Sequence, residues 1–493
     1  MKLQAFTSTL ALLLLTSALA ACSDGAAEAV TDTAAADSTA GTADPAVTEP
    51  VREMHNVPVE ELDFGGEEFF VLTYDGHNNR YYFFADAQTG DVMNDAIYER
   101  RRNVEETLNV SLKHELTADL AALSGTAKTA IIAGEDAYDQ IMLHCIDGVS
   151  AFASSGYLYN LDALPYLDLD ADWWNKEQMD VLRLGQNTYY AVNDYMIPYP
   201  FIIYFNREMV DNFDLADPYQ HVLDGTWTID IFAEMARTVV ADLNGDSVID
   251  WQNDRIGISA TDTSKYISFL PASDQFITDR DSDGRIRLAM NTEKTQRVIE
   301  IFHSLGTENV CYLPPTGNDA DQLSMRTGRI LFYMNGPDEL EKLRDCEVDF
   351  GFVPYPKWDA AQETYQSMDF GGLMCVPTTI TNPELVGAVN ELLAWDSGNN
   401  VVPTYYDILL QGKFAQDETA MQMLEIIFDS ICYEVGGNYF GFSGGFNNLF
   451  YAVSNVAFQN KSTDFASFYA KNEKSAIKTI ETFYEALDEV ESQ

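Results

Sequence analysis

Short apolar runs rich in β-branched and aromatic residues alternate along the chain with segments of helical periodicity. Residues 68–73 and 137–143 have the composition of buried strands. The same composition recurs at 201–205, 330–333 and 350–353. Residues 91–110 instead have a helical spacing, with an apolar face formed by Met93, Ile97, Val104 and Leu108. This alternation is typical of α/β proteins whose helices cover largely parallel sheets, so we predict an α/β fold.

Two more helices are indicated further along. Residues 228–240 place Phe232, Met235 and Val239 on one face, and Thr228 is the expected cap. A final helix carries Ile477, Ile480, Tyr484 and Leu487 on its apolar face.

Length and charge limit both the architecture and the partners. A chain of 493 residues exceeds the size at which one core stops growing, so two lobes are expected. Lys and Arg number 29 against 78 Asp and Glu, a formal net charge of −49. So acidic a chain repels polyanions, which excludes nucleic acid as the main partner.

The first residues are typical of an export signal. Lys2 precedes an apolar stretch centred on 11–15, and Leu19-Ala20-Ala21-Cys22 follows it. This arrangement resembles the lipobox of bacterial lipoproteins, in which the cysteine is acylated and becomes the new N-terminus. We therefore expect residues 1–21 to be a lipoprotein signal peptide, Cys22 to carry the lipid anchor, and 22–56 to be a disordered acidic tether.

Several segments of the body, in order, resemble bacterial extracellular solute-binding proteins of ABC importers, the family 1 group that includes sugar and oligosaccharide receptors. The resemblance rests on collinear order rather than on one decisive motif. The segments are 89–106, 138–141, 156–161, 204–208, 225–228, 325–337 and 371–377.

The resemblance implies a two-lobed fold, known as the periplasmic-binding or Venus flytrap fold, joined by two or three crossovers. Lobe 1 would comprise 57–200 and about 367–400, lobe 2 would comprise 201–366, and helical segments at 401–493 would be shared between them. It also implies a monomeric receptor, without catalysis of its own, that closes on a small solute and delivers it to membrane permease subunits. The expected solute is a carbohydrate, and a peptide or polyamine is the alternative.

The resembled group places its ligand at strand ends and crossovers. Sugar sites combine aromatic faces with carboxylates that bind hydroxyl groups. The candidate ligand-binding residues are accordingly Tyr74, Asp75, Trp173, Trp174, Asp194, Tyr195, Asp338, Asp369 and Phe370. Asp338 stands after Gly336-Pro337, where related sugar receptors often have an aromatic residue, which leaves a more polar or cationic ligand open.

An acidic loop follows the helix at 228–240, and no cofactor is otherwise expected. Its side-chain and carbonyl oxygens have the spacing of a calcium loop and come from Asp242, Asn244, Asp246, Val248, Asp250 and Asp254. The pattern is incomplete because Ser247 replaces the expected glycine and Asn253 the expected glutamate. A structural calcium ion and a metal-free Asx-turn loop both remain open. The shorter acidic stretch at 279–284 is expected to form a β-turn.

Two other functional classes compete with the receptor. A secreted glycoside hydrolase needs two carboxylates about 5–10 Å apart, and 78 acidic residues make such a pair possible. A carbohydrate-binding surface adhesin is the other. Incubation with oligosaccharides separates the first from a receptor, because an enzyme turns its substrate over.

Overall fold

The computed structural model describes residues 53–74, 84–145, 148–312, 325–369, 371–410, 414 and 417–492. All of these residues belong to one compact unit, 51–493. The signal peptide, Cys22, Asp75 and Phe370 lie outside the described residues.

The first sheet is mostly parallel and has the order β11-β3-β1-β2. Its central strand β1 (Glu67–Tyr74) pairs in parallel with β2 (Val110–Thr117) and β3 (Gln140–His144), and β11 (Gly372–Cys375) runs antiparallel to β3. The strand expected at 68–73 is present, and the strand expected at 137–143 begins later, at Gln140. The helix expected to reach 110 instead ends at Leu108, because Asn109 takes a left-handed conformation (φ 49°) and β2 begins directly after it.

The second sheet is mixed and has the order β5-β8-β4-β9. Its strands are β4 (Ile202–Asn206), β5 (Ile256–Ala260), β8 (Ile330–Asn335) and β9 (Phe350–Val353). β4 runs antiparallel to β8 and β9, whereas β5 and β8 are parallel. We call the parts of the molecule built around the first and second sheets lobe 1 and lobe 2.

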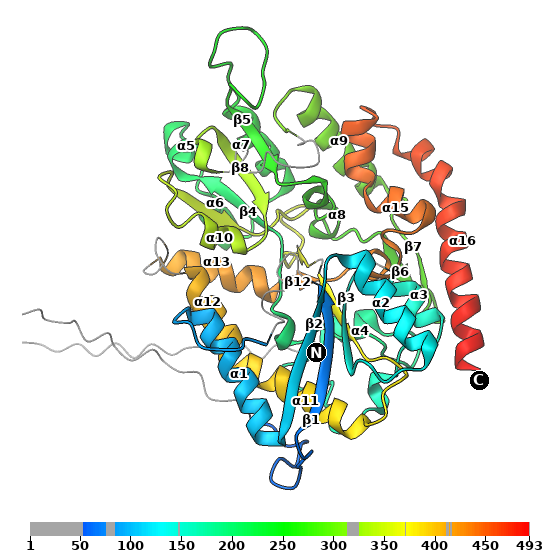
Figure 1. Ribbon diagram of the computed structural model, residues 1–493. Coiled ribbons are helices and arrows are strands. Elements are labelled where there is room, and N and C mark those ends of the chain that lie inside the picture. The colour runs from blue at the N-terminus through cyan, green and yellow to red at the C-terminus, as the bar shows by residue number, and fades with distance from the viewer. Residues whose placement is uncertain are drawn as a thin grey trace, which may run out of the picture. The chain divides into compact units, whose positions relative to one another are not determined.

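Helices cover both sheets (Figure 1). In lobe 1 these are α1 (Val92–Leu108), α2 (Leu120–Ala133), α3 (Val149–Ser154), α4 (Lys176–Leu182) and α11 (Pro383–Asp396). In lobe 2 they are α5 (Arg207–Asn212), α6 (Pro218–Leu223), α7 (Ile229–Thr238), α8 (Phe269–Ala272), α9 (Glu293–Thr307) and α10 (Asp338–Lys342). As predicted, α1 buries Met93, Ile97, Val104 and Leu108, and the Thr228 hydroxyl caps α7.

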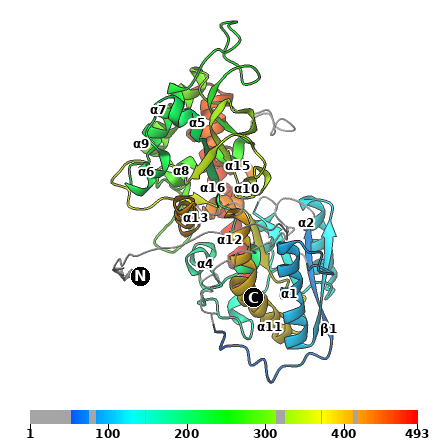
Figure 2. The same ribbon diagram turned by 90° about the vertical axis from the view of Figure 1, so that its left-hand side faces the viewer.

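The C-terminal residues form α12 (Val402–Leu410), α13 (Glu418–Asp429), α14 (Val435–Phe440), α15 (Gly444–Phe450) and α16 (Phe465–Glu491). α16 packs against both α3 of lobe 1 and α9 of lobe 2, and Figure 2 shows it from a second side. The predicted apolar face is correct for Ile480, Tyr484 and Leu487. It is wrong for Ile477, which is 39% exposed because the buried face passes through Ala476 instead.

A β-hairpin from the middle of the chain reaches lobe 1. Strands β6 (Thr278–Arg280) and β7 (Ile286–Leu288) are joined by the predicted β-turn, closed by the Gly284 N–H bonding to the Asp281 carbonyl at 3.0 Å. The Arg280 guanidinium donates to the Val181 and Arg183 carbonyls at 2.6 and 2.7 Å, at the end of α4. The hairpin therefore lies against lobe 1, although it falls within the residues assigned from sequence to lobe 2.

Among the described residues, no helix is both long enough and apolar enough to cross a membrane.

Candidate ligand-binding cavity

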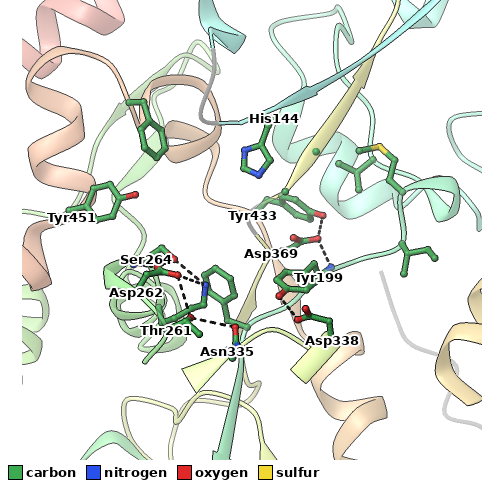
Figure 3. Close-up of a pocket in the computed structure, with 18 of the residues that line it drawn as sticks. His144, Tyr199, Thr261, Asp262, Ser264, Asn335, Asp338, Asp369, Tyr433 and Tyr451 are labelled. Carbon is green, nitrogen blue, oxygen red and sulfur yellow. Dashed lines mark hydrogen bonds and ion pairs between the residues drawn. The ribbon is translucent and has the colours of Figure 1, made fainter. Parts of the chain in front are cut away.

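A cavity of about 520 Å³ lies where the two lobes and the segments that join them meet. Its volume is within the range of small-molecule sites. It is lined by His144, Val192, Met196, Ile197, Tyr199, Phe201, Thr261, Asp262, Ser264, Lys265, Asn335, Asp338, Lys342, Asp369, Gly371, Gly372, Tyr433, Phe442 and Tyr451. Figure 3 shows polar side chains from both lobes pointing toward the same space.

Tyr199 connects the segment before β4 to lobe 2. Its hydroxyl donates to the Asp338 carboxylate at 2.5 Å, and the Lys342 ammonium lies 2.6 Å from the other oxygen of that carboxylate. The Tyr199 ring lies against Gly336, where a Cβ atom would come within 1.9 Å of the ring. A glycine is therefore required beside this ring, and the Asp338 charge is balanced inside the protein.

A second ion pair of lobe 2 also lines the cavity. The Lys265 ammonium contacts the Asp262 carboxylate at 3.2 Å and lies 4.1 Å from the centre of the Phe201 ring, a cation–π contact. Burial opposes ionisation of Asp262, but the Lys265 charge and hydrogen bonds from Ser264 outweigh it and lower its pKa. Asp262 is therefore a carboxylate at neutral pH, and a hydrogen-bond acceptor.

Asp369 occupies the centre of the polar groups in Figure 3. Its Oδ2 accepts the Tyr433 hydroxyl at 2.7 Å and the Tyr199 backbone N–H at 3.2 Å. His144 lies at the end of β3, where its Nδ1 is 3.5 Å from the Cys145 sulfur. These groups contribute donors and acceptors from lobe 1 and from the joining segments.

Aromatic rings complete the lining. Phe442 is 40% exposed, which is unusual for so large an apolar side chain, and its ring lies edge-on to that of Tyr451 at 6.0 Å. Burial, with a smaller contribution from the Asp262 charge, raises the pKa of Tyr451, so its hydroxyl stays protonated. An exposed aromatic face beside polar groups suits a ligand that has both C–H and hydroxyl surfaces.

Two of the residues predicted from sequence, Asp338 and Asp369, lie in this lining. Trp173 and Trp174 do not: both are buried, and their indole N–H groups donate to Glu391 at 3.0 and 2.7 Å. These two side chains belong to the core of lobe 1, because the buried carboxylate satisfies their only polar atoms.

Tyr74, Asp194 and Tyr195 are also absent from the lining. Tyr74 is 4% exposed at the end of β1, and burial raises the pKa of its hydroxyl. Tyr195 follows Asp194 in a short 3₁₀ turn (Asp194–Met196), where its buried ring lies 4.6 Å from the guanidinium carbon of the fully buried Arg100. These residues are predicted because they stand at strand ends and crossovers of lobe 1. That position alone does not determine whether a side chain faces the cavity or the core.

The acidic loop is held by its own hydrogen bonds. Asp254 is buried and accepts the backbone N–H groups of Leu243 and Asp250 at 2.8 and 2.9 Å, while Asp242 accepts those of Gly245 and Ser247 at 2.6 and 2.7 Å. Within the described residues, no three His, Cys, Asp or Glu side chains converge on a possible metal position. The calcium site and the metal-free Asx-turn loop both stay predictions.

Sequence reasoning missed several residues of the lining, including Tyr199, Lys265, Phe442 and Tyr451. Tyr199 carried a usable signal, because it stands between two prolines immediately before a strand. Lys265 follows β5, a strand that the sequence pattern did not reveal. Phe442 and Tyr451 lie among glycines and aromatics with no periodic pattern.

No protein-family model matches the chain, and no curated protein matches it. Several solved structures are similar to it. The galacto-N-biose/lacto-N-biose I-binding protein of an ABC transporter from Bifidobacterium longum, solved with lacto-N-biose, is 12% identical; the match covers 85% of this chain and 98% of that protein, with a TM-score of 0.57.

Two other structures are similar to the same extent. The GacH receptor of Streptomyces glaucescens, solved unliganded and with acarbose, is 14% identical over 86% of this chain and 99% of its own, with a TM-score of 0.54. The maltose/maltodextrin-binding domain MalE of Bdellovibrio bacteriovorus, bound to maltotriose, is 13% identical over 84% and 100%, with a TM-score of 0.53. The chain therefore has the two-lobed α/β fold of these binding proteins, which confirms the predicted fold class.

Proposed function

We propose that the protein is the substrate-binding subunit of an ABC importer, which captures a carbohydrate between its lobes and delivers it to permease subunits. One observation carries this proposal: a cavity of about 520 Å³ combines polar side chains of both lobes with aromatic rings. A ligand that bridges such a cavity binds the closed arrangement more tightly than an open one, and this difference in affinity drives closure.

The two Asp–Lys ion pairs of the cavity suit a neutral ligand, and the third carboxylate, Asp369, is held by hydrogen-bond donors. Asp262 is paired with Lys265, and Asp338 with Lys342, so these four groups need no counter-charge from the solute. Ionised carboxylates remain strong acceptors for hydroxyl groups, and Phe442 and Tyr451 offer rings for C–H faces. The three similar proteins named above were solved with saccharides or a saccharide analogue, which supports an oligosaccharide over a peptide or polyamine.

The same chemistry argues against the hydrolase alternative. A general acid of a glycosidase needs a raised pKa. In this cavity the pKa of Asp262 is lowered, and Asp338 is ion-paired. We infer a receptor that returns its sugar intact.

The anchor is part of the proposal. Acylation of Cys22 would hold the protein at the extracytoplasmic face of the membrane through the acidic segment that follows, close to its permease. Replacing Cys22 by Ala should release the protein from membranes and leave sugar binding unchanged. Retention of the Cys22→Ala protein in washed membranes would contradict a lipid anchor.

Calorimetric titration with lacto-N-biose, maltotriose and acarbose, followed by chromatography of the recovered sugar, tests the function. We expect one of them to bind and to be recovered uncleaved. Phe442→Ala should then weaken binding about tenfold or more. Ile477→Ala is the matched control, because Ile477 is similarly exposed (39%) but lies on α16 outside the cavity lining. Binding of a peptide or polyamine alone, or cleavage of the sugar, would overturn the proposal.

A further inference from the structure

Three of the chain segments that join the lobes run side by side. The first crossover (197–201) leads from lobe 1 into β4, and the second (366–369) leads from lobe 2 toward β11. The third (430–434) connects α13, which packs on β9, to α14, which packs on α3. Within them, β10 (Ser367–Met368) pairs with β12 (Ile431–Cys432).

Asp369 is the residue at which these three crossovers meet. Its backbone forms a β-bridge with Pro200 of the first crossover, and its N–H donates to the Cys432 carbonyl of the third at 3.2 Å. Its side chain repeats both links: Oδ2 accepts the Tyr199 N–H of the first crossover and the Tyr433 hydroxyl of the third. One residue of the second crossover thus holds the other two through main chain and side chain.

The same residue lines the ligand cavity. Asp369 is 4% exposed and belongs to the cavity lining, together with its two partners Tyr199 and Tyr433. Figure 3 shows the carboxylate between these two residues. A buried carboxylate is stable only when hydrogen bonds satisfy it, and such charge-assisted bonds are stronger than neutral ones. Any change in the donors around Asp369 therefore changes how firmly the crossovers are held together.

We propose that Asp369 is the positioning residue that couples ligand binding to lobe movement, by accepting a ligand hydroxyl with the carboxylate that fastens the three crossovers. The inference rests on the proposed function, because it assigns a regulatory role within the same cavity. A saccharide that places a hydroxyl on Asp369 favours one arrangement of the crossovers.

The test measures the distance between the lobes with and without sugar. Spin labels at Ile132→Cys on α2 and Leu223→Cys on α6 report on lobe 1 and lobe 2, and both native side chains are exposed (70% and 47%). Tyr433→Phe removes one hydrogen bond to Asp369 and keeps the ring. Asp369→Asn removes the charge. Tyr451→Phe is the control, since Tyr451 lines the cavity but belongs to no crossover.

We expect Tyr433→Phe and Asp369→Asn to broaden the distance distribution of the sugar-free protein and to weaken maltotriose or lacto-N-biose binding about tenfold. Tyr451→Phe should keep the wild-type distribution. Circular dichroism establishes whether each variant is folded. If Asp369→Asn does not fold, Tyr433→Phe alone tests the proposal. If both variants keep the wild-type distribution, Asp369 does not fasten the crossovers and the inference is overturned.

A different result would contradict the proposed function itself. If no saccharide binds or shifts the wild-type distribution, the receptor assignment is contradicted. Broadening in sugar-free Tyr433→Phe would still support Asp369 as the fastening of the crossovers in that case.

Discussion

The Tyr199 hydroxyl donates to the Asp338 carboxylate at 2.5 Å, and this bond ties the first crossover to the first turn of α10. Asp338 also pairs with Lys342 four residues later in the same helix. The two contacts hold the carboxylate in a fixed orientation at the wall of the cavity. They also explain how an acid can follow Gly336-Pro337, a position where sugar receptors of the resembled group often have an aromatic residue.

Replacing Tyr199 by Phe should weaken sugar binding more than it weakens the fold. The ring still packs on Gly336, but the carboxylate loses a donor, which we expect to cost about 1–2 kcal/mol of unfolding free energy. Urea unfolding and calorimetric titration measure the two effects. Tyr138→Phe is the matched control, because its hydroxyl donates to Glu115 at 2.8 Å outside the cavity lining. Equal sugar affinity in both variants would contradict a role for Tyr199 in the site.

Replacing Glu391 by Gln should destabilise the protein without changing sugar affinity. Each carboxylate oxygen accepts one indole N–H, so an amide nitrogen would face either Trp173 or Trp174 donor to donor. We expect a loss of about 1–3 kcal/mol in thermal or urea unfolding. If the variant loses sugar binding but keeps its stability, Trp173 and Trp174 belong to the ligand-binding site after all.

Asp139 should make the protein less stable as the pH rises. Burial raises its pKa to about 6, although the Phe70 N–H donates to it at 2.7 Å. A carboxyl whose folded pKa is raised contributes stability that is complete below its unfolded pKa, near 3.8, and lost as the pH passes about 6.

The variant Asp139→Asn removes this titration and can still accept the Phe70 N–H. Its stability relative to wild type should improve by about 1–2 kcal/mol between pH 4 and pH 7, a value reduced for partial exposure. Urea unfolding at both pH values measures the difference. A difference between variant and wild type that does not change with pH would contradict the raised pKa.

Melting experiments on the acidic loop test whether bound calcium stabilises the protein. Because Asp254 already accepts two backbone N–H groups, we expect Asp254→Ala to lower the melting temperature equally with calcium and with a chelator. Wild-type protein should melt at the same temperature in both conditions. A calcium-dependent rise would instead establish the structural calcium site that the spacing of the loop also permits.

Sequence patterns predicted the strands best where apolar runs are continuous, as in β1, β4, β8 and β9. They missed β2 because α1 ends at a single left-handed residue, Asn109, and the apolar spacing gives no sign of it. They missed β5, whose five residues include a glycine and a serine.

Two of the predicted site residues line the cavity, and both stand where topology decides position. Asp338 and Asp369 lie beside a strand end and on a crossover, and such positions face the interlobe cavity in this fold. Trp173 and Trp174 lie outside the cavity lining, and nothing in their local sequence indicates this, because their partner, Glu391, lies 218 and 217 residues away. The local sequence of an aromatic pair does not distinguish a pair buried against a distant acid from a pair open to a ligand.

The central claim is that the cavity binds a neutral saccharide and leaves it intact. The most direct measurement is thermal unfolding of the protein against lacto-N-biose, maltotriose, acarbose, amino acids, short peptides and polyamines, with each sugar analysed afterwards. A bound ligand at a hundred times its dissociation constant should add about 2.7 kcal/mol of stability. We predict this stabilisation with one saccharide and no product. Stabilisation by a peptide or polyamine alone, or release of a cleaved sugar, would contradict the account.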